Sequence, residues 1–165
     1  MIPLNTELSG DPKLQRLQSM QNYQQLANVA NGRYEEYTPK IVGGTSGGAA
    51  TYTTQRGYFL RRGIDVDAWF ALTWTGHTGT GNLRIELPFI VENSGIDIFT
   101  GTVSDSNITY AAGRTHLVLA GLNNTLYTEV QQSGSGVARQ VLAISAAGTL
   151  VGHLRYIAKR DLSRR

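Results

Sequence analysis

The sequence predicts a mainly β protein, in which an antiparallel, jelly-roll-like β-sandwich follows an extended or helical N-terminal arm. From residue 37 onward, short runs that alternate between apolar and polar residues are separated by clusters of Gly, Ser, Asn and Pro. Before residue 37, a long stretch without Gly or Pro has the composition of a helix. We therefore divide the chain into an arm (residues 1–36, helical over about residues 12–30) and a β-sandwich knob with a short basic C-terminal tail (residues 37–165).

The helix of the arm has clear start and stop signals but an unusual apolar pattern. Asp11-Pro12 supplies an N-cap and a first helical residue, and Asn31-Gly32 supplies a stop. Large apolar side chains recur every three residues, at Leu14, Leu17, Met20, Tyr23, Leu26 and Val29. Because an α-helix turns once in 3.6 residues, this stripe winds around the helix by roughly 60° per step.

Such a stripe cannot face one neighbour along its whole length. Either the segment breaks into two short helices, or different surfaces wrap it along its length. We expect an arm that contacts other subunits or another protein through the six apolar side chains, with a poorly ordered N-terminal extension as the alternative.

The strongest β signal lies between Tyr58 and Pro88. One run places five apolar side chains on one face, namely Val66, Ala68, Phe70, Leu72 and Trp74, and a second run does the same with Leu83, Ile85 and Leu87. The small, turn-prone residues 76–81 lie between them, so the pattern predicts a hairpin that ends near Pro88. Further short strands are expected over residues 38–42, 50–54, 57–61, 96–103, 107–111, 115–120, 126–131, 141–144 and 150–158.

Composition excludes several classes of protein. The chain has no cysteine, which excludes disulfides and thiolate metal sites and suggests assembly in a reducing cytoplasm. No run approaches the roughly 18 apolar residues of a membrane span, and the N-terminus has no signal-peptide pattern. We expect no membrane insertion.

The net charge of +3 comes from the C-terminal tail. Residues 152–165 carry five basic side chains and one acidic one, which gives 5 − 1 = +4, while residues 37–151 carry seven of each sign. A basic tail can bind nucleic acid, but no aromatic residue follows Tyr156 to stack on bases. The pattern therefore favours a solvated end over a nucleic-acid site.

Two glycine-rich stretches resemble ligand loops only superficially. A phosphate loop needs a Lys-Ser or Lys-Thr pair and a helix directly after its glycines, and neither residues 43–48 nor residues 76–81 are followed by them. Both are predicted to be loops between strands.

The titratable residues also give no catalytic or metal centre. His77, His116 and His153 lack metal-ligand spacing. The simpler interpretation is that backbone groups satisfy the hydrogen-bonding capacity of each ring. Asp65 and Asp67 share one strand face beside Arg61-Arg62, where a charge network is favoured over a cation site or a catalytic carboxylate pair. We predict that the protein is not an enzyme and has no cofactor and no metal.

Several segments together resemble a module of tailed-bacteriophage virion proteins. They are Thr38-Pro39 with Tyr37, Gly57-Tyr58, Arg62-Gly63, the run from Trp69 to Ile85 with Leu87-Pro88, and the closing segment 152–158 with Tyr156. The resemblance covers roughly residues 37–158. It implies a jelly-roll knob, generally trimeric, of the kind found at tail-fibre tips and on capsids as decoration or cement proteins.

The short arm favours the capsid over the tail, because a fibre tip is normally carried by a long shaft or a sizeable adaptor. We predict a homotrimer on the capsid surface of the virion, made in the bacterial host cytoplasm, whose arms bind the major capsid protein and stabilise the shell. The alternative is a tail-fibre or receptor-binding tip that recognises a host-surface glycan, with Tyr52, Tyr58, Tyr110 and Tyr127 as candidate contacts. A free lectin or carbohydrate-active enzyme is a weaker third class, because no carboxylate pair stands out.

Overall fold

The structure is a computed structural model that describes residues 16–23, 33–92 and 100–160. Its described residues are mainly β, as predicted. The strands are β1 Arg33–Tyr37, β2 Ile41–Gly43, β3 Ala50–Arg62, β4 Asp65–His77, β5 Leu83–Glu86, β6 Thr100–Ser106, β7 His116–Gly121, β8 Tyr127–Gly134, β9 Val137–Val141 and β10 Gly148–Ile157. No helix among the described residues is long and apolar enough to cross a membrane.

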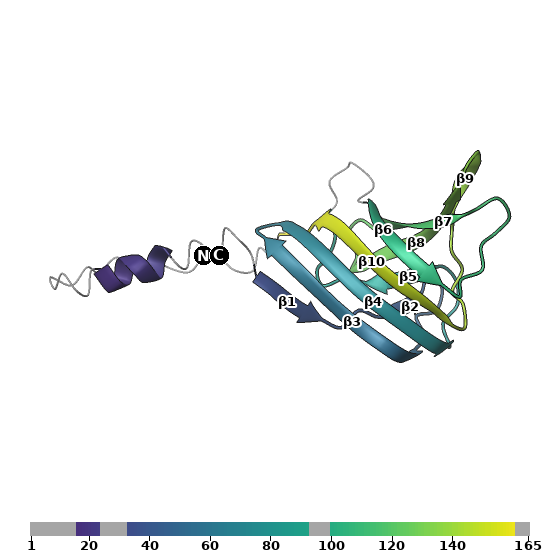
Figure 1. The fold of residues 1–165 in the computed structure, drawn as a ribbon, viewed down its shortest axis with the longest axis horizontal. Helices are drawn as coiled ribbons and strands as arrows, with labels where there is room; N and C mark the ends of the chain where they lie inside the picture. Colours follow the sequence, from purple (N-terminus) through teal and green to yellow (C-terminus); the bar gives the residue numbers. More distant parts are fainter. Residues whose placement is uncertain (1–15, 24–32, 93–99, 161–165) are drawn as a thin grey trace.

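All ten strands belong to one antiparallel sheet that curls on itself (Figure 1). Their order is β1-β3-β4-β10-β6-β7-β8-β5-β2, and β9 pairs with the C-terminal part of β8. The structure therefore shows a curled, half-barrel-like sheet and not the predicted sandwich of two separate sheets. The physical reason is that β6 hydrogen-bonds to both β10 and β7, which joins the two halves into one ladder.

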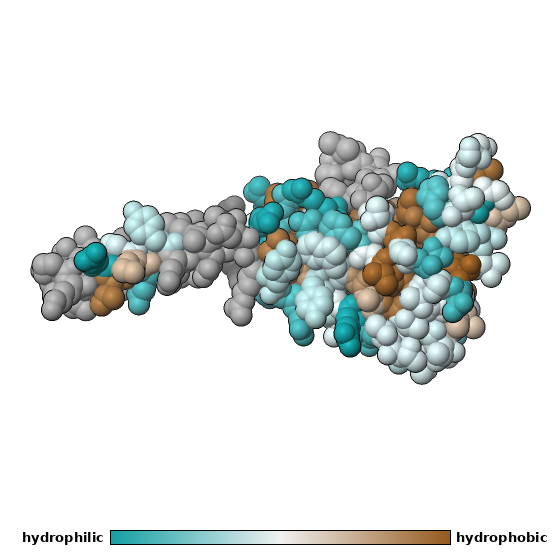
Figure 2. Space-filling model, viewed as in Figure 1, coloured by the Kyte–Doolittle hydropathy of each residue, from teal (hydrophilic) through white to brown (hydrophobic). Residues whose placement is uncertain are grey.

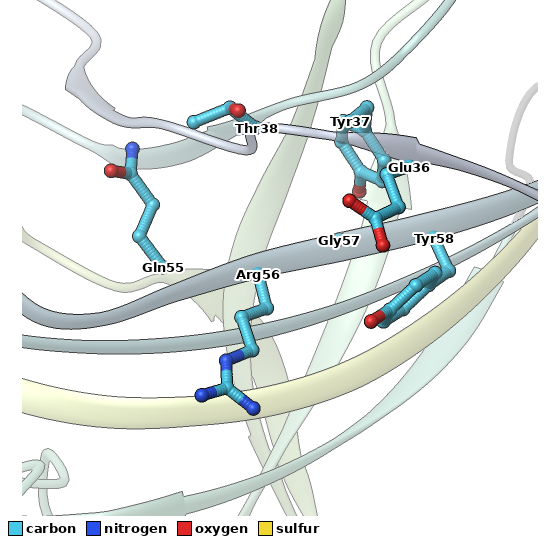
Figure 3. Close-up of a pocket in the computed structure, with 7 residues that line it drawn as sticks. All are labelled: Glu36, Tyr37, Thr38, Gln55, Arg56, Gly57 and Tyr58. Carbon is cyan, nitrogen blue, oxygen red and sulfur yellow. The ribbon is translucent and has the colours of Figure 1, made fainter.

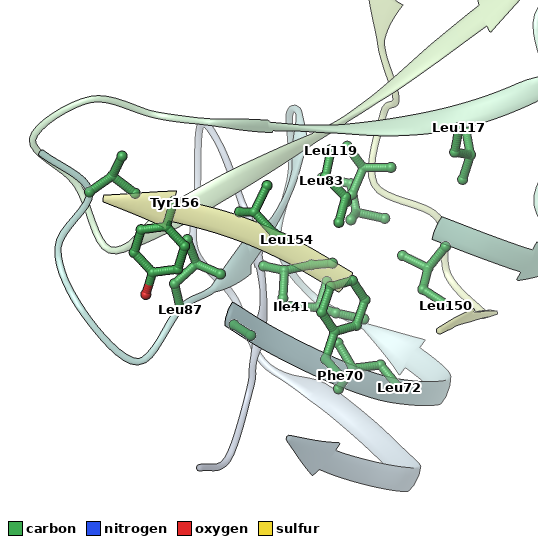
Figure 4. Packing of buried hydrophobic residues seen from close by; sticks show 14 of the residues in the cluster. Ile41, Phe70, Leu72, Leu83, Leu87, Leu117, Leu119, Leu150, Leu154 and Tyr156 are labelled. Carbon is green, nitrogen blue, oxygen red and sulfur yellow. The ribbon is translucent and has the colours of Figure 1, made fainter. Parts of the chain in front are cut away.

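The core lies inside the curl. The five alternating apolar residues of β4 are each at most 3% exposed, and Leu83, Ile85 and Leu87 are at most 2% exposed, which confirms the predicted apolar faces. These residues pack in one cluster with Leu150, Leu154 and Tyr156 of β10, the neighbour of β4 in the sheet, and with Leu117, Leu119 and Val130 of β7 and β8 (Figure 4). Burial of this continuous face is the main stabilising contribution to the fold.

Two glycines of β10 make room for the aromatic rings of β4. A Cβ atom at Gly152 would lie 2.5 Å from the ring of Phe70, and one at Gly148 would lie 2.6 Å from the ring of Trp74. Each glycine is the direct register partner of the residue whose ring covers it. The large rings of one strand therefore fill the space that the neighbouring strand leaves.

The predicted hairpin between residues 58 and 88 is wrong in its pairing. β4 pairs with β3 through a turn at Gly63 and, on its other side, with β10. β5 instead pairs with β2 and β8 on the opposite wall. Residues 50–54 and 57–61, predicted as separate strands, form one strand that is irregular near Tyr52, whereas residues 107–111 form a loop that begins with Asn107 at φ 59°.

The two glycine-rich loops pack against each other and form what we call the glycine corner (residues 43–49 and 77–82). Backbone hydrogen bonds join them, from Gly44 to Asn82 (2.8 Å), from Thr45 to Thr80 (3.0 Å), from Thr80 to Ser46 (3.0 Å) and from Thr78 to Ala49 (3.0 Å). The β3–β4 pair and the β2–β5 pair are therefore one long two-stranded ribbon that bends at this corner from one wall of the curl to the other.

The arm is described only in part. Residues 16–23 are helical, and Figure 1 shows this segment clear of the sheet. Residues 33–36, assigned to the arm from the sequence, are the first residues of β1 and pair with β3. The predicted helix start at Asp11 and the predicted stop at Asn31 lie outside the described residues.

Glycine substitutions in the corner test its role. Gly48 has a φ of +64°, and an added Cβ would lie 2.0 Å from the backbone nitrogen of Gly79. We expect Gly48→Ala to lower the free energy of unfolding by more than the roughly 1–3 kcal/mol of left-handed strain alone, because the two loops must also separate. Urea unfolding measures the loss.

Two matched glycines separate strain from crowding. Gly136 has a φ of +72° with open space around it, and Gly47 has open space without a positive φ. Gly136→Ala should show the strain alone, and Gly47→Ala should leave the unfolding free energy almost unchanged. An equal loss at Gly48 and Gly136 would contradict the proposed close packing of the loops.

Buried tyrosines predict a loss of stability at high pH. Burial raises the pKa of Tyr37 and of Tyr156 well above the usual tyrosine value, and burial with the hydrogen bond to Asp105 raises that of Tyr110 to about 12. Because the folded pKa exceeds the unfolded one, this stability is fully present below about pH 10 and is lost as the pH rises through the folded pKa. Urea midpoints should therefore stay constant from about pH 9 to about pH 10 and fall between about pH 10 and about pH 12; a constant midpoint over the whole range would contradict these pKa shifts.

Candidate functional site

The predicted arm contacts are exposed where the structure describes them. Leu17, Met20 and Tyr23 lie on the helical segment with 56%, 59% and 73% of their surface exposed. At 100° per residue the three side chains fall within an arc of about 120°, which makes one apolar stripe over these two turns. Leu14, Leu26 and Val29 lie outside the described residues.

A second group of exposed and half-buried side chains crosses the outer face of the sheet. The register places five residues directly opposite one another on neighbouring strands: Glu36 on β1, Tyr58 on β3, Trp69 on β4, His153 on β10 and Thr102 on β6. Residues that are register partners point to the same face of a sheet. We call this set the outer-face row.

Ring stacking holds the centre of the outer-face row. The rings of Trp69 and His153 are stacked, with centroids 4.8 Å apart and planes 22° apart, and Tyr34 lies 5.9 Å from Trp69 on the other side. The Nε2 atom of His153 lies 3.2 Å from Oδ1 of Asp67, which orients the imidazole. Trp69 is therefore fixed between two rings.

One hollow lies at the β1 end of the row, with a volume of about 350 Å³ (Figure 3). Its walls come from β1, the segment after it and β3, and its lining residues are Glu36, Tyr37, Thr38, Gln55, Arg56, Gly57 and Tyr58. Figure 3 shows the side chains of Arg56 and Tyr58 on the same side of β3, and Glu36 shares their face of the sheet because it is the register partner of Tyr58. In the described part of the chain, neither Glu36 nor Arg56 forms an ion pair.

A second hollow, of about 390 Å³, lies at the other end of the row. It is lined by Trp69, Thr102, Val103, Ser104, Val151, Gly152 and His153. Val151 is 52% exposed, and Figure 2, viewed onto β1, β3, β4 and β10, shows hydrophobic side chains beside neutral ones on this face. The outer face thus offers a charged, polar hollow and a more apolar one on either side of the Tyr58–Trp69 pair.

Both carboxylates of the acidic pair identified in the sequence have a basic side chain as a neighbour on β10. Asp65 accepts a hydrogen bond from Arg155 at 3.2 Å, which raises the pKa of that guanidinium, and Asp67 faces His153. Arg61 instead lies over the ring of Phe89, with its guanidinium carbon 4.2 Å from the centroid. The two carboxylates therefore belong to a charge network, and the described residues contain no group of three His, Cys, Asp or Glu that could hold a metal.

The remaining histidines lie in separate surroundings. Gly79 donates its N–H to Nδ1 of His77 at 2.8 Å, so that the ring is left to donate from Nε2 to the carbonyl of Ile41 at 3.2 Å. His77 is thus a structural part of the glycine corner. His116 is exposed at the start of β7, with Thr115 as its neighbour at 3.3 Å.

Of the four tyrosines proposed as glycan contacts, Tyr58 is the one with a largely exposed side chain, at 46%. The hydroxyl of Tyr52 accepts a hydrogen bond from Ile41 N–H, and that of Tyr110 donates to Asp105. Sequence reasoning missed Trp69 and Tyr34. For Trp69 the signal was present, because it occupies a polar-face position of β4, out of phase with the five buried apolar residues.

No protein-family model and no curated protein sequence match this chain. Among solved structures, it is similar to the crystal structure of Dettilon tailspike protein (gp208), with a TM-score of 0.53 and 16% sequence identity. The likeness covers 76% of this chain and 24% of the tailspike chain, so this chain spans about a quarter of the length of that protein. At this identity the likeness shows a shared fold.

Proposed function

We propose that this protein is a structural component of a bacteriophage particle. In this proposal the curled sheet is a knob at the particle surface, and the segment before β1 attaches it. Two findings support it: the sequence resemblance to virion β-knob modules and the fold shared with part of a phage tailspike. The single observation that carries the attachment role is the exposed apolar stripe of Leu17, Met20 and Tyr23.

The attachment partner that we propose is the major capsid protein, which makes the chain a decoration or cement protein on the capsid surface. Full burial of a large apolar side chain contributes about 1.5–3 kcal/mol, so the three described residues supply about 4–9 kcal/mol per arm. In a homotrimer, three arms on one shell would bind together and raise the effective affinity further. Weak single contacts therefore suffice for tight attachment.

The second candidate is a tail-fibre or receptor-binding tip. The observation that favours it is the outer-face row, where Tyr58 and two charges that form no ion pair with any described residue line a hollow that is large enough for a small ligand. The fold shared with a tailspike supports the same candidate. In this case the arm would attach the knob to a tail component, and the sheet would contact a glycan of the host surface.

Immunogold labelling separates the two locations. Intact particles are labelled with an antibody against the sheet domain and viewed by electron microscopy. The capsid proposal predicts label over the head, and the tail proposal predicts label at the tail tip. Particles that carry the chain in neither place would contradict the virion proposal itself.

Substitutions on the helical segment test the arm. We expect the triple variant Leu17→Ser, Met20→Ser, Tyr23→Ser to bind purified shells at least about 1000-fold more weakly, because about 4 kcal/mol or more of apolar burial is lost. Sedimentation with shells measures the bound fraction.

Gln21→Ser is the matched control, since Gln21 is also exposed on this segment. It should bind shells like the unchanged chain. Circular dichroism and sedimentation velocity check that the triple variant keeps its fold and its oligomeric state. If the folded triple variant decorates shells normally, the proposed role of the arm is wrong.

A further inference from the structure

We infer that the hollow between β1 and β3 is a saccharide-binding site for a neutral pyranose. The ring of Tyr58 is the platform for the C–H face of the sugar, and Glu36 and Arg56 are the partners of its hydroxyl groups. This inference deepens the receptor-binding candidate. It rests on that candidate for the claim that the sugar belongs to the host surface, whereas the claim that the chain binds a sugar rests on the hollow alone.

The hollow has the size and lining of a small-molecule site. Its volume of about 350 Å³ lies at the lower end of the range for ligand pockets, roughly 300–1,000 Å³. One exposed aromatic ring stands among a carboxylate, a guanidinium, an amide and a hydroxyl, from Glu36, Arg56, Gln55 and Thr38. Arg and Tyr are common in protein–protein interfaces, but a carboxylate such as Glu36 is depleted there, and the hollow is concave, so the carboxylate and the shape favour a small polar ligand over a protein surface.

The charges indicate that the ligand is neutral and carries hydroxyl groups. Glu36 is the register partner of Tyr58, while Arg56 lies two residues along β3 on the same face. Within the described part of the chain the two form no ion pair, so the acceptor and the donor are both available. An anion would be attracted by Arg56 but repelled by Glu36, and a cation the reverse, so an ion gains little net attraction from the two together, whereas a hydroxyl group can donate to Glu36 or accept from Arg56. Hydrogen bonds to charged groups are also stronger than neutral ones.

Close packing and a hydrogen bond hold the two walls of the hollow together. A Cβ atom at Gly57 would lie 2.5 Å from the ring of Tyr37 and 2.8 Å from Cδ of Pro39, so the glycine lets the segment after β1 lie close to β3. Gln55 donates from Nε2 to the carbonyl of Pro39 at 2.9 Å, which ties the same segment to β3. The hollow is therefore formed before any ligand arrives, and binding requires little ordering of the chain.

The platform ring lies next to an ordered aromatic cluster on the same face of the sheet. Tyr58 is the register partner of Trp69, whose ring is held between His153 and Tyr34. A pyranose with an unsubstituted C–H face can then lie against the exposed part of the Tyr58 ring while its hydroxyl groups reach Glu36 and Arg56.

NMR titration of the full chain with methyl glycosides tests the site. The probes are the methyl glycosides of glucose, galactose, mannose and N-acetylglucosamine, with glucuronate and glucosamine as charged analogues. We expect at least one neutral glycoside to shift the Tyr58 ring and the backbone amides near Glu36 and Arg56 in a saturable way. The two charged analogues should bind more weakly than the neutral sugar of the same ring.

Substitutions divide the site into platform and hydroxyl partners. Tyr58→Ala should weaken binding at least tenfold, and Tyr58→Phe should retain most of it because the ring remains. Glu36→Gln and Arg56→Ala should each weaken binding several-fold. The matched controls are Glu35→Gln, whose register partner is Phe59 on the opposite face of β3, and Arg139→Ala, an exposed cation on β9; both should bind normally.

The failures of this inference and of the proposed function can be told apart. Absence of saturable shifts with every neutral glycoside, or unchanged binding by folded Tyr58→Ala, would overturn the saccharide site. A Tyr58→Ala variant that instead changes the oligomeric state in sedimentation, with no sugar binding in the unchanged chain, would overturn it in favour of an interface between copies. Sugar binding by a chain that immunogold labelling places on the head would support this site and contradict the tail location.

Discussion

The whole sheet depends on the close packing of two glycine-rich loops at the glycine corner. There the ribbon made of β2, β3, β4 and β5 changes from one wall of the curl to the other while its backbone hydrogen bonds continue. Gly48 and Gly79 come so close that a Cβ at Gly48 would lie 2.0 Å from the neighbouring nitrogen. His77 fastens the same corner through both ring nitrogens. Without this bend, the apolar faces of β4 and β5 could not meet across one core.

The curl has a direct consequence for the outer surface. Because the interior takes the large apolar side chains of both walls, the outer face of β1, β3, β4, β10 and β6 is left for other residues. Hydroxyl groups and paired charges cover much of it, as in the Thr149–Thr73 contact of 3.2 Å and the Arg155–Asp65 pair. Against this background the exposed Tyr34 and Tyr58 and the stacked Trp69 stand out. Large aromatic groups on a solvated sheet face are more often explained by binding than by stability.

The arm and the outer face have different roles in the proposed function. The exposed apolar residues on the helical segment suit attachment to a partner, since they do not belong to the core cluster of the sheet. The hollow beside Tyr58 suits recognition, since its polar groups are fixed by strand register. The two roles are compatible, because the arm joins the sheet at β1, at the edge of the same face. Attachment and recognition can therefore be altered separately.

The sequence by itself determined the β class and the buried faces of β4 and β5, because alternation along a strand is a local property. It named Tyr58 only as one of four candidate tyrosines, and the structure decided which of the four is exposed. It also indicated that the histidines would be satisfied structurally, which holds for His77. Only the tertiary structure decided which strands pair. The long-range bonds of the glycine corner replaced the expected hairpin, and β6 joined two expected sheets into one. The same is true of the candidate site: Glu36 and Trp69 lie 33 residues apart in sequence, and only the register of β1, β3 and β4 places them in one row.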